Sequence, residues 1–190
     1  SRIFSFYVPD DKDRIELRFL CRLFRDALKP PPLYTTFPHP NYPILGKLMA
    51  AFNKLYKTDP NKAPKIVFVL KGTWLNSLPA CWVVINYPMK MIGAGQNKTF
   101  LSNYVIEIGL GLCTKETGKR VVLKEMTSSG SLWSGLYTDD GLSFLCDRMT
   151  FAKCQRHGVS ALNTKGRLIN CVITQCRQSG LYCGKNALIE

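Results

Sequence analysis

The chain has 190 residues, of which 46% are hydrophobic, so it can bury a sizeable core and we do not expect a disordered protein. It has no run of about 18 apolar residues, which excludes a transmembrane helix. The net charge of +13 is spread along the chain, with no Lys/Arg run longer than two residues. We therefore expect a solvated basic surface rather than a nucleic-acid site.

The first 37 residues contain one clear helical pattern. Between Ile15 and Leu28 apolar residues recur at spacings of three and four, and arginines occupy the opposite face. Asp13 is suited to cap the N-terminus of this helix, and the prolines from Pro30 onward end it. On periodicity alone the segment is a generic amphipathic helix.

The order of residues in this segment resembles the F-box family. Ile3–Phe6 corresponds to the family's first apolar segment, Leu20–Leu28 (LCRLFRDAL) to its charged helix, and Leu33–Phe37 to its closing segment. Phe24 and Tyr34 stand where the family most often has Trp, and the family's opening Leu-Pro is missing. The resemblance implies docking to the adaptor subunit of an SCF-type ubiquitin ligase. The apolar residues that would make this contact are Phe4, Leu17, Leu20, Leu23, Phe24 and Leu28.

Residues 38–64 read as a proline-rich linker followed by a second helix. Pro38, Pro40 and Pro43 disfavour helix and indicate an extended linker. From Ile44 to Lys57 a broad apolar stripe recurs at helical spacing. Stacked strands need their open end covered, so we expect this helix to cap the strands that follow. A helix that binds a partner is the alternative.

The next part of the chain contains short apolar segments separated by glycines and polar turns. Such segments are typical of buried strands rather than helices, because they are short and rich in Val and Ile. The predicted strands are Lys65–Gly72, Trp82–Ile85, Met89–Gly95, Tyr104–Ile108 and Val121–Met126.

The C-terminal part of the chain repeats itself. Ser134–Tyr137 (SGLY) returns as Ser179–Tyr182 (SGLY), and a weaker copy, His157–Ser160 (HGVS), lies between them in steps of 23 and 22 residues. A fixed period of this length is typical of a solenoid. Other positions follow the same steps, in columns made of Leu123, Cys146 and Leu168; of Met126, Met149 and Cys171; of Ser128, Phe151 and Ile173; and of Leu136, Val159 and Leu181.

The repeat unit leaves no room for a helix, so it predicts short strands joined by turns and stacked in parallel about 4.8 Å apart. The repeated glycines fall at the corners, where a positive φ or a close backbone approach favours Gly. Asn163, Asn170 and Asn186 suit turns in the left-handed region. An antiparallel sandwich that repeats by chance is the alternative.

The corner motifs and the strands Cys146–Phe151 and Leu168–Ile173 resemble the right-handed parallel β-helix family, to which pectate lyases belong. The resemblance covers roughly residues 65–190. We therefore expect a mainly β protein in three parts. These are a partial α-helical F-box-like segment at 1–37, a Pro-rich linker and capping helix at 38–64, and a right-handed parallel β-helix (pectin-lyase-like) at 65–190.

Both ends of the sequence suggest a longer protein. The chain does not start with Met, and residues 186–190 begin another coil. We expect a truncated last coil that exposes a strand edge and part of the core, so the isolated chain should self-associate.

The resemblance raises the question of a catalytic site. Asp139-Asp140 and His157 are similar to parts of a polygalacturonase motif, but its Asn-Thr-Asp and Arg-Ile-Lys elements are missing. Asp147-Arg148 is the nearest candidate for a pectate-lyase-like calcium site, but the positions that the repeat stacks on it do not complete a calcium cage. We expect no catalytic residue, no metal and no cofactor.

The eight cysteines include no CxxC pair, which argues against a zinc site. Cys146, Cys171 and Cys183 lie on repeat columns, where they suit small buried residues. In the absence of a secretory signal we expect free thiols, and a cytoplasmic or nuclear protein.

These features together predict a non-catalytic interaction protein. The leading hypothesis is a substrate-recruiting F-box subunit of an SCF-type ubiquitin ligase, with the adaptor subunit and a substrate protein as its partners and no membrane contact. The alternative is a carbohydrate-binding or polysaccharide-cleaving β-helix protein. A structural β-helix with another partner is the third possibility.

Overall fold

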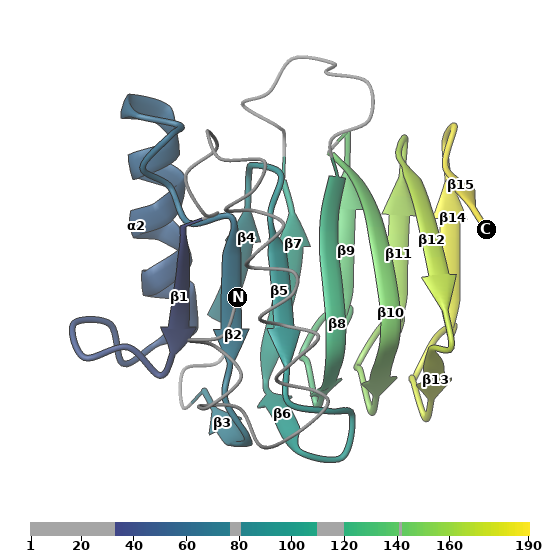
Figure 1. Ribbon diagram of the computed structural model, residues 1–190. Helices are drawn as coiled ribbons and strands as arrows, with labels where there is room; N and C mark the ends of the chain where they lie inside the picture. Colours follow the sequence, from purple (N-terminus) through teal and green to yellow (C-terminus); the bar gives the residue numbers. More distant parts are fainter. Residues whose placement is uncertain (1–32, 77–80, 110–119, 141) are drawn as a thin grey trace, which may run out of the picture. The chain divides into compact units, whose positions relative to one another are not determined.

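The computed structural model describes residues 33–76, 81–109, 120–140 and 142–190. Residues 33–190 form a stack of β-coils with one helix at its beginning (Figure 1). The ladders between named strands are all parallel. The mainly β architecture and the parallel β-solenoid that the repeat predicts are therefore confirmed. No helix among the described residues is long and apolar enough to cross a bilayer.

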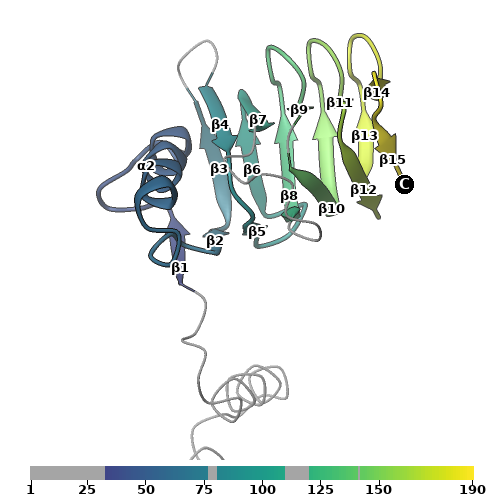
Figure 2. The ribbon, with the colours of Figure 1, turned by 90° about the horizontal axis from the view of Figure 1, so that it is seen from above.

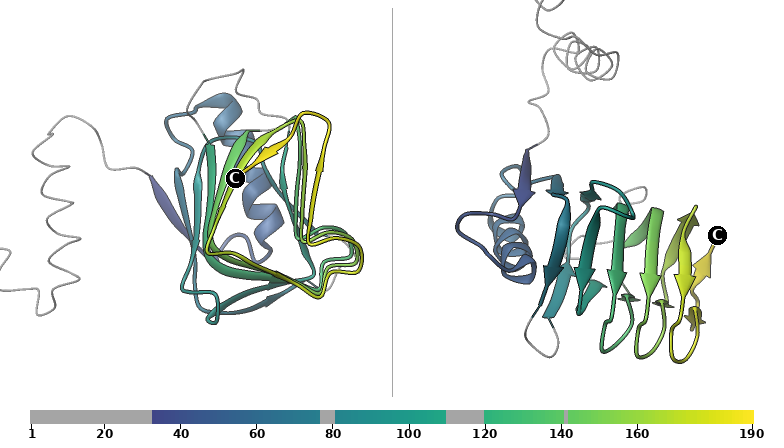
Figure 3. Two further views of the ribbon diagram at one scale, coloured as in Figure 1. Left: turned by 90° about the vertical axis from the view of Figure 1, so that its right-hand side faces the viewer. Right: turned by 90° about the horizontal axis from the view of Figure 1, so that it is seen from below.

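The strands form two sheets that are built from the same coils. The five-stranded sheet has the order β14-β11-β9-β7-β4, and the larger sheet has ten strands. Successive coils superimpose when the stack is viewed along its axis (Figure 3, left). The strands of the five-stranded sheet are β4 (Cys81–Ile85), β7 (Tyr104–Ile108), β9 (Leu136–Asp139), β11 (Val159–Leu162) and β14 (Leu181–Gly184). Those of the larger sheet are β1 (Tyr34–Phe37), β2 (Ile66–Val69), β3 (Gly72–Leu75), β5 (Lys90–Gly93), β6 (Thr99–Ser102), β8 (Arg120–Ser129), β10 (Ser143–Ala152), β12 (Lys165–Ile169), β13 (Val172–Thr174) and β15 (Leu188–Ile189).

The strand register confirms the columns that the sequence predicts. Each coil places the side chain of a column directly over its counterpart in the coil before, and most of these side chains are apolar and belong to the buried core or pack against it. The aligned sets are Leu123 with Cys146 and Leu168; Met126 with Met149; Ser128 with Phe151 and Ile173; and Leu136 with Val159 and Leu181.

The coils turn at residues in the left-handed region. Glu125 (φ 57°) and Arg148 (φ 51°) bend the long strands β8 and β10, and Asn170 (φ 51°) occupies the same place between β12 and β13. A second corner contains Asn163 (φ 49°). Asn163 and Asn170 confirm two of the three predicted positions. The prediction for Asn186 is wrong by one residue, because Lys185 (φ 55°) takes the left-handed conformation in that turn. Glu125 and Arg148 show that the geometry of the coil imposes this conformation even on residues that rarely adopt it.

Close packing, rather than a positive φ, explains the repeated glycines. A Cβ atom on Gly158 would lie 2.2 Å from Cγ2 of Ile173 and 2.8 Å from the carbonyl oxygen of Gly180. A Cβ on Gly135 would lie 2.9 Å from the carbonyl oxygen of Gly158, whereas a Cβ on Gly180 would meet nothing closer than 3.3 Å. The corner columns therefore need Gly because neighbouring coils approach too closely for a side chain.

Helix α2 (Leu45–Thr58) covers the strand edge at the start of the stack (Figure 2). The helix expected over 44–57 is thus confirmed, with bounds shifted by one residue. Asn53 Nδ2 donates to the carbonyl oxygen of Val84 (2.8 Å), and the N–H of Asn86 donates to Asn53 Oδ1 (3.1 Å). β4 is the outermost strand of its sheet, so its outer edge has no neighbouring strand to hydrogen-bond with. Asn53 forms hydrogen bonds with backbone groups at this edge instead. The buried apolar residues of the helix are Leu45, Leu48, Met49 and Phe52.

Residues 34–37 form β1, the first strand of the larger sheet. Tyr34 lies opposite Ile66 and Phe37 opposite Val69 in a parallel ladder with β2. Phe37 is 1% exposed and Tyr34 is 68% exposed, which is the alternation of a half-buried strand. The sequence interpretation assigned these residues to the F-box-like segment at 1–37, whereas the structure pairs them with the solenoid.

Candidate functional site

The outer surface of the five-stranded sheet carries a row of large side chains. Val83, Ile106 and Leu136 point into the core and are fully buried. The residue after each of them faces outward, because side chains alternate along a strand. The outward row consists of Val84, Glu107, Tyr137, Ser160 and Tyr182 in strand-to-strand register, and all of these are large except Ser160, which is small and buried.

Three aromatic rings gather beside this row. The Trp82 ring lies 6.5 Å from the Trp133 ring and 6.3 Å from the Tyr137 ring, centroid to centroid, and meets Tyr137 edge-on. Val105, the strand neighbour of Trp82, is 1% exposed yet lies outside the core cluster. The rings therefore cover an apolar strip on the outside of the sheet. We define the aromatic face as Trp82, Glu107, Trp133, Tyr137 and Tyr182.

Two basic side chains, Arg156 and His157, stack on aromatic rings of this surface. The guanidinium carbon of Arg156 lies 3.2 Å from the centroid of the Trp133 ring. His157 stacks on Tyr182, with centroids 4.8 Å apart and an interplanar angle of 17°. Burial, helped by the charge of Arg156, lowers the pKa of His157, so its imidazole is neutral at pH 7. The face thus shows that its rings accept stacking partners.

Glu107 is the carboxylate of the aromatic face. Burial raises its pKa, and none of the described lysine, arginine or histidine side chains forms an ion pair with it. Its register neighbour Tyr137 donates to Asp139 Oδ2 (3.5 Å), and burial followed by the charge of Asp139 raises the pKa of Tyr137. The face therefore combines exposed ring surface with one carboxylate that the described residues leave without a cation.

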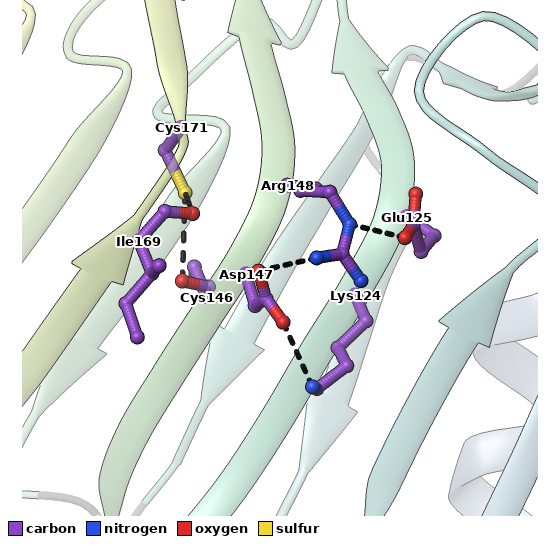
Figure 4. Close-up of polar contacts among 7 residues, drawn as sticks. All are labelled: Lys124, Glu125, Cys146, Asp147, Arg148, Ile169 and Cys171. Carbon is purple, nitrogen blue, oxygen red and sulfur yellow. Dashed lines mark hydrogen bonds and ion pairs between the residues drawn. The ribbon is translucent and has the colours of Figure 1, made fainter.

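A second cluster of outward side chains lies on the larger sheet, where β8 and β10 bend at Glu125 and Arg148 (Figure 4). Lys124 Nζ lies 2.8 Å from Asp147 Oδ2, and Asp147 Oδ1 lies 3.4 Å from Arg148 Nη1. Arg148 Nε donates to Glu125 Oε1. Asp147 stands opposite Lys124 in the register of β8 and β10. In this charge-paired corner, defined as Lys124, Glu125, Asp147 and Arg148, each charge is balanced by the neighbouring coil.

The charge-paired corner contains the Asp147-Arg148 pair that the sequence compares with a calcium site. The side chains around Asp147 are cations, which repel a metal ion rather than bind it. Among the described residues, no three His, Cys, Asp or Glu side chains lie together as a metal site would require.

The residues that resemble a polygalacturonase motif are not brought together. Asp139 lies 3.3 Å from Lys185 Nζ, and Asp140 accepts a hydrogen bond from Asn163. The register places Asp139 opposite Leu162, five residues after His157. Since a strand rises about 3.3 Å per residue, His157 is roughly 16 Å from Asp139 along the coil. These groups cannot act on one glycosidic bond as an acid and a base.

The F-box-like contact residues Phe4, Leu17, Leu20, Leu23, Phe24 and Leu28 lie outside the described residues. Their adaptor-binding role stays a prediction. Comparison with protein-family models, with curated proteins and with solved structures finds no match to this chain.

The aromatic face was not among the predicted sites, although part of it has a sequence signal. Tyr137 and Tyr182 occupy the same place in the two SGLY motifs, one residue after the inward Leu136 and Leu181. Alternation within a strand therefore indicates that both tyrosines point outward. Trp133 lies between strands and has no such signal.

Proposed function

We propose that this protein is a non-catalytic interaction protein whose aromatic face binds a partner protein. The observation that carries the proposal is the gathering of Trp82, Trp133 and Tyr137 on one outward surface beside Arg156. Trp, Tyr and Arg are the residues on which binding energy concentrates in protein interfaces. The stacked coils hold these side chains on a regular sheet, so little conformational entropy is lost when a partner binds.

The role we propose is substrate recruitment to an SCF-type ubiquitin ligase, in the cytoplasm or nucleus. The aromatic face would bind the substrate, and the F-box-like segment at 1–37 would bind the adaptor through residues such as Leu20 and Phe24. The finer fold assignment, a right-handed pectin-lyase-like β-helix, belongs to the same proposal. Its support is the SGLY and HGVS corners together with the parallel register of the coils.

Site-directed photo-cross-linking tests where the partner binds. The photoreactive residue p-benzoylphenylalanine replaces Tyr182 on the aromatic face in one variant and Val172 on the larger sheet in the other. The two positions are matched, because both lie in the last coil and are 45% and 50% exposed. In cells that express the protein, we expect a discrete adduct from position 182 and none from position 172. Equal labelling at both positions would remove the support for a specific face.

The adaptor part of the proposal needs its own test. A pull-down of the protein with the SCF adaptor should succeed and should be lost when Leu20 and Phe24 are both changed to Ala. The Tyr182 adduct should persist in this double variant, because the two contacts are on different parts of the chain. A folded protein that does not bind the adaptor would leave the helical pattern at 15–28 as a generic amphipathic helix, and the aromatic face would still be tested by itself.

Carbohydrate binding is the second candidate function. The partly exposed rings of Trp82, Trp133 and Tyr137 would stack against the apolar faces of sugar rings. Polysaccharide cleavage is less well supported than binding, because Asp139 and His157 lie far apart along the coil. Titration with soluble polysaccharides, followed by tryptophan fluorescence, decides between the candidates. A saturable change that Trp82→Ala removes would favour the sugar over the protein partner.

A further inference from the structure

Two cysteines occupy equivalent turns of neighbouring coils. Ala152 at the end of β10 stands opposite Thr174 at the end of β13, and two residues later in each coil come Cys154 and Cys176. The N–H of Arg177 donates to the carbonyl oxygen of Cys154 (2.9 Å), so the two turns are hydrogen-bonded to each other as well. Cys176 therefore lies directly over Cys154 in the stack.

The two thiols point the same way. Cys154 Sγ lies 3.6 Å from the carbonyl oxygen of Ala152, and Cys176 Sγ lies 3.6 Å from that of Thr174. A Cβ atom on Gly135 would lie 3.1 Å from Cys154 Sγ, and a Cβ on Gly158 in the next coil would lie 3.3 Å from Cys176 Sγ, so each thiol faces the equivalent glycine. Neighbouring coils are about 4.8 Å apart, which lies within the Cα–Cα range of roughly 4.4–6.8 Å that a disulfide spans. The spacing of the coils therefore allows a bond between the two sulfurs.

The two thiols differ in access to solvent. Cys154 is 1% exposed, whereas Cys176 is only partly buried. Burial, followed by the neighbouring Cys176, raises the pKa of Cys154 to about 12. Because it is the more exposed of the two, Cys176 is the thiol that meets a reagent first, and Cys154 is placed to attack the resulting mixed disulfide.

We propose that Cys154 and Cys176 are an oxidation site, at which a low-molecular-mass disulfide such as oxidised glutathione converts the two thiols into an inter-coil disulfide. The Cys176 thiolate attacks the reagent, forms a mixed disulfide and releases one glutathione thiolate. Cys154 then loses its proton and attacks the Cys176 sulfur, which releases the second glutathione. The protein loses two electrons and two protons, and one oxidised glutathione becomes two reduced ones.

The new bond would add a covalent cross-link between two turns that are otherwise joined side by side by a backbone hydrogen bond. It lies at the corner that precedes β11 and β14, the strands that continue the five-stranded sheet. The reduced pair suits a cytoplasmic or nuclear compartment, and oxidation there would act as a reversible clamp on that sheet. This inference does not depend on which partner binds the aromatic face.

The test uses the full chain treated with oxidised glutathione and digested without reduction. We expect a peptide pair linked through Cys154 and Cys176, with a mass two hydrogen atoms below the sum of the two reduced peptides, and we expect dithiothreitol to separate the pair. The exposed Cys183 provides an internal control, because it should form a stable mixed disulfide with glutathione. A map in which Cys183 is modified while Cys154 and Cys176 remain thiols would overturn the proposal.

Single variants then assign the order of attack. With Cys154→Ser, the mixed disulfide should accumulate at Cys176, whereas Cys176→Ser should leave Cys154 unmodified because it is buried. Cys146 and Cys171 are a matched negative pair. Cys146 is fully buried, and Cys171 Sγ donates to the backbone carbonyl of Cys146 (3.5 Å; Figure 4). A Cys146–Cys171 link that forms as fast as the predicted one would contradict the assigned geometry. The peptide map of the unsubstituted protein tests the proposal even if a cysteine variant does not fold.

Discussion

The charge-paired corner and the aromatic face are both outward surfaces of one solenoid, yet they differ in what their side chains contact. At the corner, Asp147 and Arg148 are balanced by charges from the adjacent coil. On the aromatic face, ring surface stays partly exposed, and Glu107 has no ion-pair partner among the described residues. The charged groups of the corner hold neighbouring coils together, whereas the rings and Glu107 of the aromatic face remain available to bind a partner.

We expect the largest effect on stability from a substitution at a close contact between neighbouring coils. Gly158→Ala places a methyl group against Ile173 and the backbone of Gly180, and overpacking of this kind costs about 1–3 kcal/mol of unfolding free energy. Gly180→Ala is the matched control, since its nearest contact is 3.3 Å away. Urea denaturation of both variants measures the difference. Equal losses would mean that the glycines do not mark the closest approach between coils.

Removing the central carboxylate of the charge-paired corner should have a smaller effect. Asp147→Asn leaves Lys124 and Arg148 without their shared partner, and we expect a loss of about 1 kcal/mol, at the upper end for an ion pair near the surface. Asp59→Asn, which breaks only the exposed pair with Lys62, should cost less. Unfolding at low and high salt checks the assignment. A loss that does not shrink with salt would point to packing rather than charge pairing.

The smallest stability effect should come from Glu107 on the aromatic face. Burial raises the pKa of this carboxyl in the folded state, so the folded protein binds its proton more tightly than the unfolded chain does. Ionised Glu107 is therefore unfavourable, and stability should fall as the pH rises from the unfolded pKa, about 4.3, through the higher folded value.

Glu107→Gln removes this pH dependence. The variant should be slightly more stable than the wild type at pH 7, within the ~0.5 kcal/mol typical of surface changes, and the advantage should disappear near pH 4. Thermal unfolding across this pH range measures it. A variant that is less stable than the wild type at pH 7 would show that Glu107 has a stabilising partner.

Sequence reasoning works well where the repeat is regular. Leu123, Cys146 and Leu168 are equally spaced, so the sequence alone aligns them, and the register agrees. The turns at Asn163 and Asn170 were predictable for the same reason, since Asn tolerates the left-handed region.

The 22- to 23-residue repeat does not predict the aromatic face. Glu107 and Tyr137 are register neighbours but lie 30 residues apart, and Trp82 and Trp133 are 51 residues apart. Neither spacing matches the period of 22 to 23 residues, so the repeat does not reveal these alignments. Short strands such as β3 and β6 were missed because four residues carry too little periodicity.

The central claim is that the aromatic face, and not the charge-paired corner, binds the partner. The most direct measurement compares the dissociation constants of two variants for the protein that cross-links at position 182. Trp82→Ala with Tyr137→Ala removes two rings and should weaken binding at least ~30-fold, as hot-spot residues do, while Asp147→Asn should leave binding unchanged. Circular dichroism confirms that both variants are folded. Weakened binding in Asp147→Asn, with the ring variant unaffected, would contradict the account.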